Sequence, residues 1–255
     1  MKKNPTVLSL KDVTIGYDNN IIMQDINFDV RRGEIISILG QSGCGKSTLL
    51  KNIIGLYTPI KGSITIFGRS LAKCSEIRRK VMMKKMGITY QSGALLGSLS
   101  VAENVALPLE EHTEKSADEI AAVVREKLAL VGMDKFADYM PSEISGGMKK
   151  RAGLARALAL NPELLFFDEP SAGLDPISSA EFDSLIKSIR DSINATVVLV
   201  THELDSIFAI SDRVIVLDKT IKTIADIGNP HELKNNSKSE FVRRLLGRNN
   251  LKRQE

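Results

Sequence analysis

The chain has 255 residues, 43% of them apolar, with 35 basic and 31 acidic side chains and a net charge of +4. No apolar run approaches the roughly eighteen residues of a membrane-spanning helix, which excludes an integral membrane protein. The charge excess lies in the last fifteen residues, so the rest is neutral overall, which argues against a nucleic-acid-binding body with a basic face.

The chain begins with MKKNPTVLSLKD, which has basic residues but neither the apolar segment nor the cleavage site of a signal peptide. Of the two cysteines, Cys74 and Cys44, the second falls inside a glycine-rich loop where a disulfide would be obstructive. We therefore expect the chain to work in a reducing compartment, the cytoplasm.

Residues 1 to about 92 are rich in strand-like segments, among them VLSLKDVTI, INFDV and SITIFG. Residues 34–39 are apolar on both faces, as in a buried parallel strand, and residues 46–55 have helical character. Between them, GQSGCGKS at 40–47 fits the phosphate-loop pattern G-x-x-x-x-G-K-[ST]. An ordinary glycine turn is the weaker interpretation, because a strand and a helix flank the loop as the pattern requires.

The phosphate-loop pattern has a specific physical basis. Glycines at 40, 43 and 45 let the backbone curl so that successive amides point at a β-phosphate, at the positive end of the following helix. Lys46 then reaches the β- and γ-phosphates, and the Ser47 hydroxyl binds magnesium.

Helical patterns dominate from about residue 93 to 160, and SEISGGMKKRAGLARALAL at 142–160 places Ser145, Gly146 and Gly147 before a helix. Ser145 could be only a helix N-cap. A serine and two glycines at a helix N-terminus also form an anion site, and one polypeptide has little use for two γ-phosphate sites. We therefore expect a head-to-tail pair, in which this segment of each subunit closes on the ATP of the other.

In ELLFFDEP at 163–170, residues 164–167 predict another buried strand. Asp168 at its end can hold the magnesium shell, and Glu169 is placed to polarise a water for in-line attack on the γ-phosphate. Alone, an Asp-Glu pair after an apolar run would more often be a solvated turn. The phosphate loop favours the catalytic interpretation.

These motifs, in this order, resemble those of ATP-binding cassette (ABC) transporter ATPases over nearly the whole chain. The resemblance implies an α/β P-loop fold with a parallel core sheet, an antiparallel β subdomain and an inserted helical subdomain at about 93–160. It implies one ATPase domain at 1–228, followed by a short basic C-terminal extension at 229–255. ISGGM departs from the common LSGGQ signature, with Ile144 for Leu and Met148 for Gln.

The resemblance assigns further residues. Tyr17 would stack on adenine, although a strand aromatic is the structural alternative. Gln91 would touch magnesium or the attacking water, Asp175 lies in the D-loop motif SAGLD, and His202 would contact the γ-phosphate and orient the water and Glu169. The expected cofactors are ATP and Mg²⁺, with Ser47, Gln91 and Asp168 around the metal. The expected ATP-binding residues are Tyr17, Gly40, Gln41, Ser42, Gly43, Cys44, Gly45, Lys46, Ser47 and Thr48; the catalytic set is Glu169, His202, Gln91 and Lys46.

The uncharged segment SGALLGSLS after Gln91 matches the position that contacts the coupling helices of membrane subunits in this family. Short apolar side chains at Leu95, Leu96 and Leu99 could form a socket for a partner helix. The competing interpretation is that these leucines pack the helical subdomain, and both can hold.

The QSGAL block, the PLEEHT run and the methionine of SGGM resemble the ATPases of Mce/Mla-type lipid transporters. That resemblance implies a homodimer of ATPase subunits on the cytoplasmic face of the inner membrane, without nucleic acid. It also implies a membrane permease, a periplasmic Mce-domain protein and a STAS-domain protein as partners. The alternatives are a permease for an amino acid, ion or drug, or a soluble ABC protein of DNA repair or translation.

Overall fold

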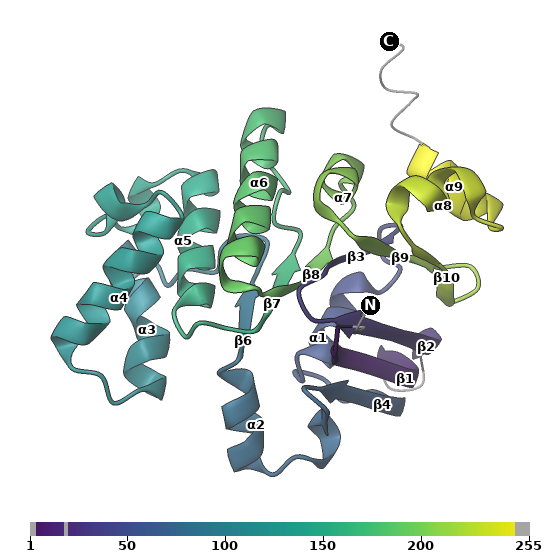
Figure 1. Cartoon of the computed structure of the whole chain (residues 1–255), viewed down its shortest axis with the longest axis horizontal. Coiled ribbons are helices and arrows are strands. Elements are labelled where there is room, and N and C mark those ends of the chain that lie inside the picture. The colour runs from purple at the N-terminus through teal and green to yellow at the C-terminus, as the bar shows by residue number, and fades with distance from the viewer. Residues whose placement is uncertain (1–3, 18–19, 248–255) are drawn as a thin grey trace.

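The computed structural model describes residues 4–17 and 20–247 (Figure 1). Its central sheet has the strand order β10-β9-β3-β8-β7-β6, and all pairs are parallel except β9 with β10. The strands of this sheet are β3 (Ile35–Gly40), β6 (Met86–Thr89), β7 (Leu164–Asp168), β8 (Thr196–Val200), β9 (Arg213–Asp218) and β10 (Thr223–Gly228). The strands expected at 34–39 and 164–167 therefore form: β3 is displaced by one residue toward the C-terminus, and β7 extends one residue further.

The central sheet is covered on both faces, which explains why its strands are apolar on both. The covering helices are α1 (Lys46–Ile53), α6 (Pro176–Ile193) and α7 (Leu204–Ile210). Side chains alternate along β8: Val198 and Val200 pack on one face with Ile53 of α1, and Val197 and Leu199 on the other with Ile186 of α6. The phosphate loop lies between β3 and α1.

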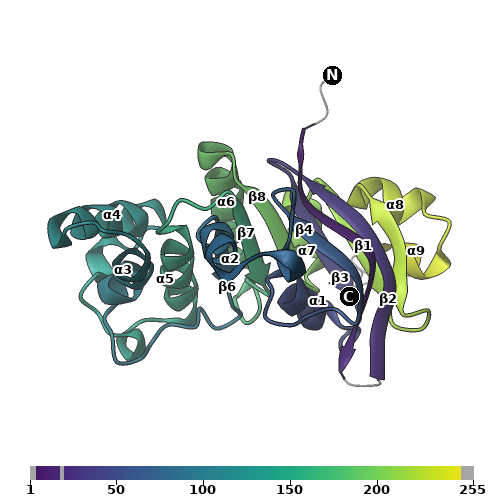
Figure 2. The same ribbon diagram turned by 90° about the horizontal axis from the view of Figure 1, so that it is seen from below.

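A second, antiparallel sheet has the order β2-β1-β4-β5 and lies beside the central sheet (Figure 2). Its strands are β1 (Thr6–Tyr17), β2 (Asn20–Arg31), β4 (Lys61–Ile66) and β5 (Arg69–Ser70), and α2 (Glu76–Met83) follows. Residues of β1, β2 and β4 pack in one core with α1 and the near face of the central sheet. This is the expected β subdomain, and its core holds α1 and the phosphate loop in place.

Three helices gather at one end of the molecule, away from the antiparallel sheet (Figures 1 and 2): α3 (Val101–His112), α4 (Ala117–Leu130) and α5 (Gly146–Leu158). Capping boxes, Ser100 with Glu103 and Ser116 with Glu119, start α3 and α4. Leu154 of α5 packs in the same core as strand β7, so the expected helical subdomain shares its core with the sheet.

The segment after residue 228 packs on the central sheet, whereas the sequence placed a domain boundary there. It forms α8 (Pro230–Asn236) and α9 (Glu240–Gly247). Val242 and Leu246 of α9 are fully buried against Leu39 and Val216, because the helix has one apolar face. The core therefore continues to Leu246. The basic residues Arg248, Lys252 and Arg253 lie outside the described residues.

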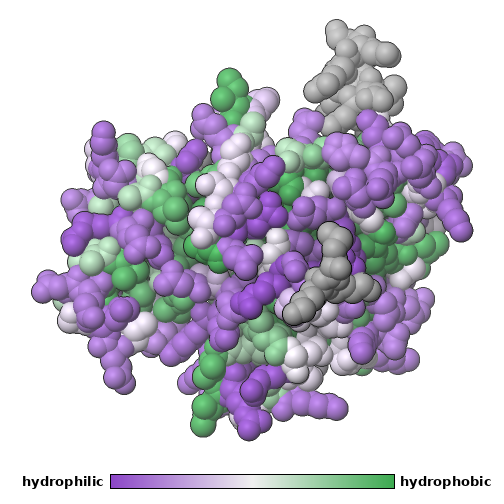
Figure 3. Space-filling model, viewed as in Figure 1, coloured by the Kyte–Doolittle hydropathy of each residue, from purple (hydrophilic) through white to green (hydrophobic). Residues whose placement is uncertain are grey.

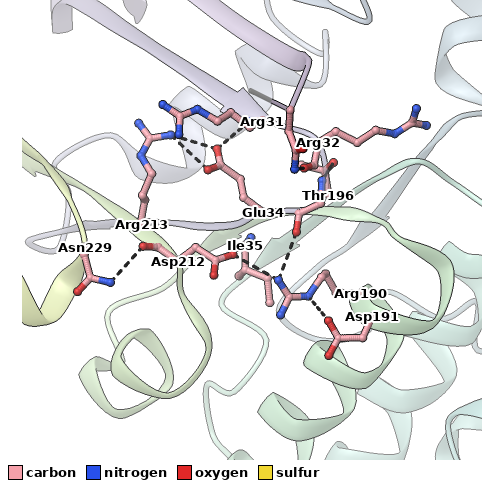
Figure 4. A network of polar contacts seen from close by, with 12 residues as sticks. Arg31, Arg32, Glu34, Ile35, Arg190, Asp191, Thr196, Asp212, Arg213 and Asn229 are labelled. Atoms are coloured by element: carbon pink, nitrogen blue, oxygen red, sulfur yellow. Dashed lines mark hydrogen bonds and ion pairs between the residues drawn. The ribbon is translucent and has the colours of Figure 1, made fainter. Parts of the chain in front are cut away.

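A polar network holds together the amino-terminal ends of the central strands, at the opposite end of β3 from the phosphate loop (Figure 4). Asp212 accepts hydrogen bonds from the Ile35 amide (2.8 Å) and the Arg190 guanidinium (3.4 Å). Glu34 forms an ion pair with Arg213 at 3.1 Å, and its carboxylate accepts a hydrogen bond from the Arg31 amide at 2.7 Å. The network joins β2, β3, α6 and β9. Within residues 4–17 and 20–247, no helix combines the length and apolar character needed to cross a membrane.

Candidate active site

The phosphate loop has the curled backbone that its glycines predict, although they act in two ways. Gly43 and Gly45 have φ of 74° and 102°, a left-handed region that strongly favours glycine. Gly40 is needed for space instead, because a Cβ there would lie 2.5 Å from the Cys44 sulfur. Cys44 is 2% exposed, and burial raises the pKa of its thiol. Its side chain therefore packs behind the loop, and only its backbone can serve a phosphate.

Lys46 is the first residue of α1 and is 9% exposed. Its ammonium donates to the carbonyl oxygens of Gly40 (2.9 Å) and Gln41 (3.3 Å), at the mouth of the loop. A buried ammonium with an excess of donors over partners is suited to an anion. The expected contact between Lys46 and phosphate oxygens fits this position.

The Ser47 hydroxyl donates to Asp168 Oδ1 at 3.4 Å, which joins the phosphate loop to the end of β7. Burial, and then the charge of Glu169, raise the pKa of Asp168. The oxygen atoms of Ser47 and Asp168 are ligands of the kind that Mg²⁺ prefers. A bound cation would also reduce the repulsion between the Asp168 and Glu169 carboxylates. The residues therefore fit the expected Mg²⁺.

Glu169 and His202 form the contact next to the phosphate loop. The Glu169 Oε2 atom lies 2.7 Å from His202 Nδ1 and accepts a bond from the His202 amide at 3.3 Å. Glu169 has φ of 50°, an uncommon backbone conformation for a residue other than glycine, and its amide donates to Val200 at 2.8 Å. The backbone thus turns this carboxylate, 14% exposed, toward the site.

These groups line one cavity of about 1020 Å³. Its polar lining combines the phosphate loop with side chains from three other segments, and Leu39 and Leu245 add apolar surface. The residues expected for ATP and catalysis that line it are Gly40, Gln41, Ser42, Gly43, Gly45, Lys46, Ser47, Thr48, Gln91, Glu169 and His202. The sequence analysis missed Leu245, since nothing in the order of motifs places α9 beside the loop.

Tyr17 stands at the first turn of α1. Its hydroxyl lies 3.3 Å from the Thr48 hydroxyl, and its ring packs edge-on against Tyr57 with centroids 5.8 Å apart. The residue is 46% exposed, beside the phosphate loop. An exposed aromatic at this place can stack on a base.

The segment after Gln91 lies directly on α5. The Arg156 guanidinium donates to the Gly93 carbonyl at 3.0 Å, and Gly153 lies against Gly93. Buried Asn104 donates to the carbonyls of Leu96, Leu99 and Ser100 and accepts the Leu96 amide. The sequence analysis missed these contacts. The only signal was an Asn and an Arg at otherwise apolar helix positions.

The three leucines of this segment differ. Leu95 packs against the core shared by the helices and the sheet, and Leu99 is partly buried. Leu96 is 50% exposed. The packing interpretation thus fits Leu95, and Leu96 has the exposure that a docking residue needs.

Ser145 is the N-cap of α5, and its hydroxyl accepts the Met148 amide at 3.3 Å. Ser145, Gly146 and Gly147 do not line the cavity around their own phosphate loop. Asp175 is the N-cap of α6, and hydrogen bonds from Ser178 lower the pKa of its carboxyl. Both motifs therefore have a capping role within the subunit, and the exposed Ser145 and Gly146 leave their surface for a partner.

Lys150 is a further functional candidate that the sequence analysis did not single out. It lies on α5, is 7% exposed, and donates to the Pro170 and Ala172 carbonyls directly after Glu169. A second lysine after SGGM was the available signal, but basic residues on a helix are usually solvated.

Comparison with known proteins agrees with this site. The sequence pattern of the family described as "ABC transporter" matches residues 23–172. The chain is 38% identical to the "Intermembrane phospholipid transport system ATP-binding protein MlaF" of Haemophilus influenzae, over 96% of this chain and 92% of that protein. It is 40% identical to the "Probable ribonucleotide transport ATP-binding protein mkl" of Mycobacterium leprae, over 94% of this chain and 68% of that protein.

Solved structures give the same result. A cbiO1 protein from Clostridium perfringens, part of the ABC transporter complex cbiONQ, superposes with a TM-score of 0.82 at 28% identity, over 95% of both chains. The ATP-binding cassette MJ0796, solved as a dimer bound to ADP and Pi after hydrolysis, superposes with a TM-score of 0.78 at 29% identity, over 87% of this chain and 98% of that one.

Proposed function

Because this chain belongs to the ABC transporter family and carries its ATP-binding ATPase fold, we propose that it hydrolyses ATP to drive phospholipid transport between the inner and outer membranes through a separate permease. The observation that supports phospholipid as the transported substrate is the match to MlaF, which covers 92% of that protein. The match to mkl, whose name gives ribonucleotides as the cargo, covers 68% of that protein. The QSGAL, PLEEHT and SGGM segments add support.

The proposed chemistry follows from the contacts around Glu169. Its Oε2 atom is held by His202, so we assign Oε1 to accept the proton of a water that attacks the γ-phosphorus in line. The bond between that phosphorus and the β,γ-bridging oxygen breaks, and ADP leaves. His202 fixes the carboxylate through Nδ1, and its Nε2 atom, which lies 3.3 Å from Glu203 Oε1, would have to leave that carboxylate to contact the γ-phosphate.

The remaining residues bind and orient. Lys46 and the loop amides offset the negative charge on the γ-phosphate, and Tyr17 stacks on adenine. Ser47, Asp168 and Gln91 would hold Mg²⁺, which would neutralise negative charge on the phosphates. Each of these groups borders the cavity or contacts a residue that does.

The working unit in this proposal is a homodimer with two ATP molecules between the subunits. Ser145, Gly146 and Gly147 lie outside their own cavity, with open space around Gly146. Amides at a helix N-terminus attract anions, so the γ-phosphate of the opposing subunit is a suitable ligand. Asp175 would face the partner in the same interface.

The permease would dock beside the segment that follows Gln91. Leu96 is exposed there, while Asn104 holds the backbone of its turn in place. Apolar side chains also gather on the surface at α2, where Ile77 is 78% and Val81 57% exposed (Figure 3). This arrangement supports a peripheral position of the chain on a membrane permease, at the cytoplasmic face of the inner membrane. The resemblance to Mce/Mla-type ATPases is the reason for proposing a periplasmic Mce-domain protein and a STAS-domain protein as further partners.

The test of the cargo is purification of the native complex from detergent-solubilised membranes through a tag on this chain. Mass spectrometry then identifies the bound proteins and extracted lipids. We expect a multispanning permease, an Mce-domain protein and enriched phospholipid. A permease with a different solute-binding protein would overturn the cargo while leaving the catalytic assignments in place.

A further inference from the structure

Lys150 has an unusual environment for a lysine. It lies on the second turn of α5, and its side chain is buried at 7% exposure. Its ammonium donates hydrogen bonds to the carbonyl oxygens of Pro170 and Ala172, both at 2.6 Å. An ammonium loses its hydration on burial, so a protein retains it there only with compensating partners.

The partners of Lys150 belong to the turn that directly follows Glu169. The Glu169 carbonyl accepts the Ala172 amide at 3.3 Å, and the left-handed backbone of Glu169 starts this turn. Burial lowers the pKa of Lys150, whereas the negative charge of Glu169 raises it. The hydrogen bonds to Pro170 and Ala172 thus fix the backbone that directly follows Glu169.

The same helix carries the groups expected to meet the opposing ATP. Ser145 caps α5 five positions, about one and a half turns, before Lys150, so one short stretch of helix connects the two residues. On another side, the Gly93 backbone after Gln91 packs on α5, where a Cβ at Gly93 would lie 2.5 Å from the Lys149 carbonyl oxygen. α5 thus contacts the segments of both Gln91 and Glu169.

We propose that Lys150 is a positioning residue that ties the N-terminal turns of α5 to the Glu169 turn, so that ATP of the opposing subunit, when it docks on Ser145, sets the Glu169 carboxylate for attack. This inference rests on the proposed roles of Glu169 as base and of Ser145 in the dimer. The three donors of the ammonium satisfy both carbonyls at once, whereas a methionine side chain has no donor and a glutamine amide, with two donors, is one atom shorter.

The experiment compares Lys150→Met, Lys150→Gln and Lys150→Arg in the full chain assembled with its native permease. We expect Lys150→Met to lower kcat about 10- to 100-fold, the scale of a small misplacement of a reacting group, with KM for ATP within about twofold of wild type. Lys150→Gln should retain more kcat than Lys150→Met, since its amide can still donate to one carbonyl. Equal loss in both contradicts the hydrogen-bonding role.

A stability control separates positioning from folding. Leu154→Ala removes a fully buried side chain four positions, about one helix turn, after Lys150, and it should lower the melting temperature while kcat stays near wild type. If Leu154→Ala loses kcat as Lys150→Met does, general loosening of α5 explains both. Lys150→Arg, which keeps a buried cation, remains informative if Lys150→Met does not fold.

Glu169→Gln, assayed in parallel, distinguishes failure of the proposed base Glu169 from failure of the proposed positioning role of Lys150. If Glu169→Gln keeps wild-type turnover, the base assignment fails and the role of Lys150 fails with it. If Glu169→Gln abolishes turnover while Lys150→Met keeps wild-type kcat, the positioning role alone is wrong.

Discussion

The backbone of Gly93 lies against Gly153 so closely that a Cβ on Gly153 would stand 2.7 Å from the Gly93 carbonyl oxygen. The segment that follows Gln91 and the helix that follows Ser145 are therefore in direct backbone contact. Arg156 reinforces it with a hydrogen bond of 3.0 Å to the same carbonyl. Only glycine at 153 permits this approach without moving one of the two segments.

We expect Gly153→Ala to displace the Gln91 segment, because the added methyl group meets backbone rather than a flexible side chain. Turnover should fall, and the free energy of unfolding should drop by about 1–3 kcal/mol, the range for overpacking. Chemical denaturation and phosphate release measure the two effects. Gly97→Ala is the matched control, since a Cβ at Gly97 meets nothing within 4 Å; equal effects of both substitutions would contradict the argument.

Glu169→Gln removes the proposed general base and keeps the shape of the side chain. Turnover should fall at least about 10²-fold, the usual contribution of a general base, while nucleotide affinity is retained. Phosphate release and binding of a fluorescent ATP analogue check the two parts. Glu203→Gln alters the carboxylate 3.3 Å from His202 Nε2 and should have a far smaller effect. If Glu169→Gln turned over at the wild-type rate, another group would be the base.

Leu96 and Leu95 should separate docking from packing. Leu96→Asp places a charge on an exposed side chain, so stability should change by no more than about 0.5 kcal/mol while co-purification with the permease is lost. Leu95→Ala removes core packing and should lower stability by about 2 kcal/mol. Co-purification that survives Leu96→Asp would exclude Leu96 from the interface.

Asp183 gives a prediction about pH. This side chain of α6 is 4% exposed, and burial raises the pKa of its carboxyl despite a hydrogen bond from Ser206. A raised pKa means that the folded state favours the protonated form. The stability from Asp183 is therefore fully present below its ordinary pKa of about 3.9 and is lost as pH rises through the raised value.

Asp183→Asn should consequently melt at a higher temperature than wild type at pH 7, and the difference should shrink as the pH is lowered toward 4. Thermal unfolding at several pH values measures this. Glu181→Gln, an exposed carboxylate on the same helix, should show little difference at any pH. A destabilised Asp183→Asn at pH 7 would show that the ionised carboxylate is favourable in the fold.

The polar network at the amino-terminal ends of the central strands should contribute to the stability of the fold without changing the binding of ATP. Asp212→Ala leaves the buried Ile35 amide of β3 without its acceptor, so unfolding should become easier by about 1–3 kcal/mol. Asp212→Asn keeps an acceptor and should lose less. KM for ATP should stay at the wild-type value in both, because the phosphate loop is at the opposite end of β3. A changed KM would show that the network reaches the site.

The sequence predicted what is encoded in contiguous stretches. The phosphate loop needs Gly43 and Gly45 at fixed spacing, and β7 ends at Asp168, directly before Glu169, because a buried strand must stop where charges begin. These local patterns carry their own geometry. The strands beside them were predictable because residues covered on both faces must be apolar.

Contacts between distant segments were not predictable in this way. The carbonyls that Lys150 binds are some 20 residues away along the chain, so its burial shows only when α5 packs on the turn after Glu169. Leu245 reaches the cavity because α9 folds back on the sheet, which an amphipathic pattern alone does not locate. Cys44 illustrates the same limit: its motif position suggested contact with ATP, and its side chain is buried behind the loop.

The central claim is that ATP hydrolysis by this chain moves phospholipid, and reconstitution tests it most directly. The purified native complex is placed in proteoliposomes, and transfer of a labelled phospholipid to an acceptor is followed with ATP, without ATP and with the Glu169→Gln chain. We predict transfer that requires ATP and is lost with Glu169→Gln. Equal transfer in all three conditions, or ATP hydrolysis that moves no phospholipid, would contradict the account.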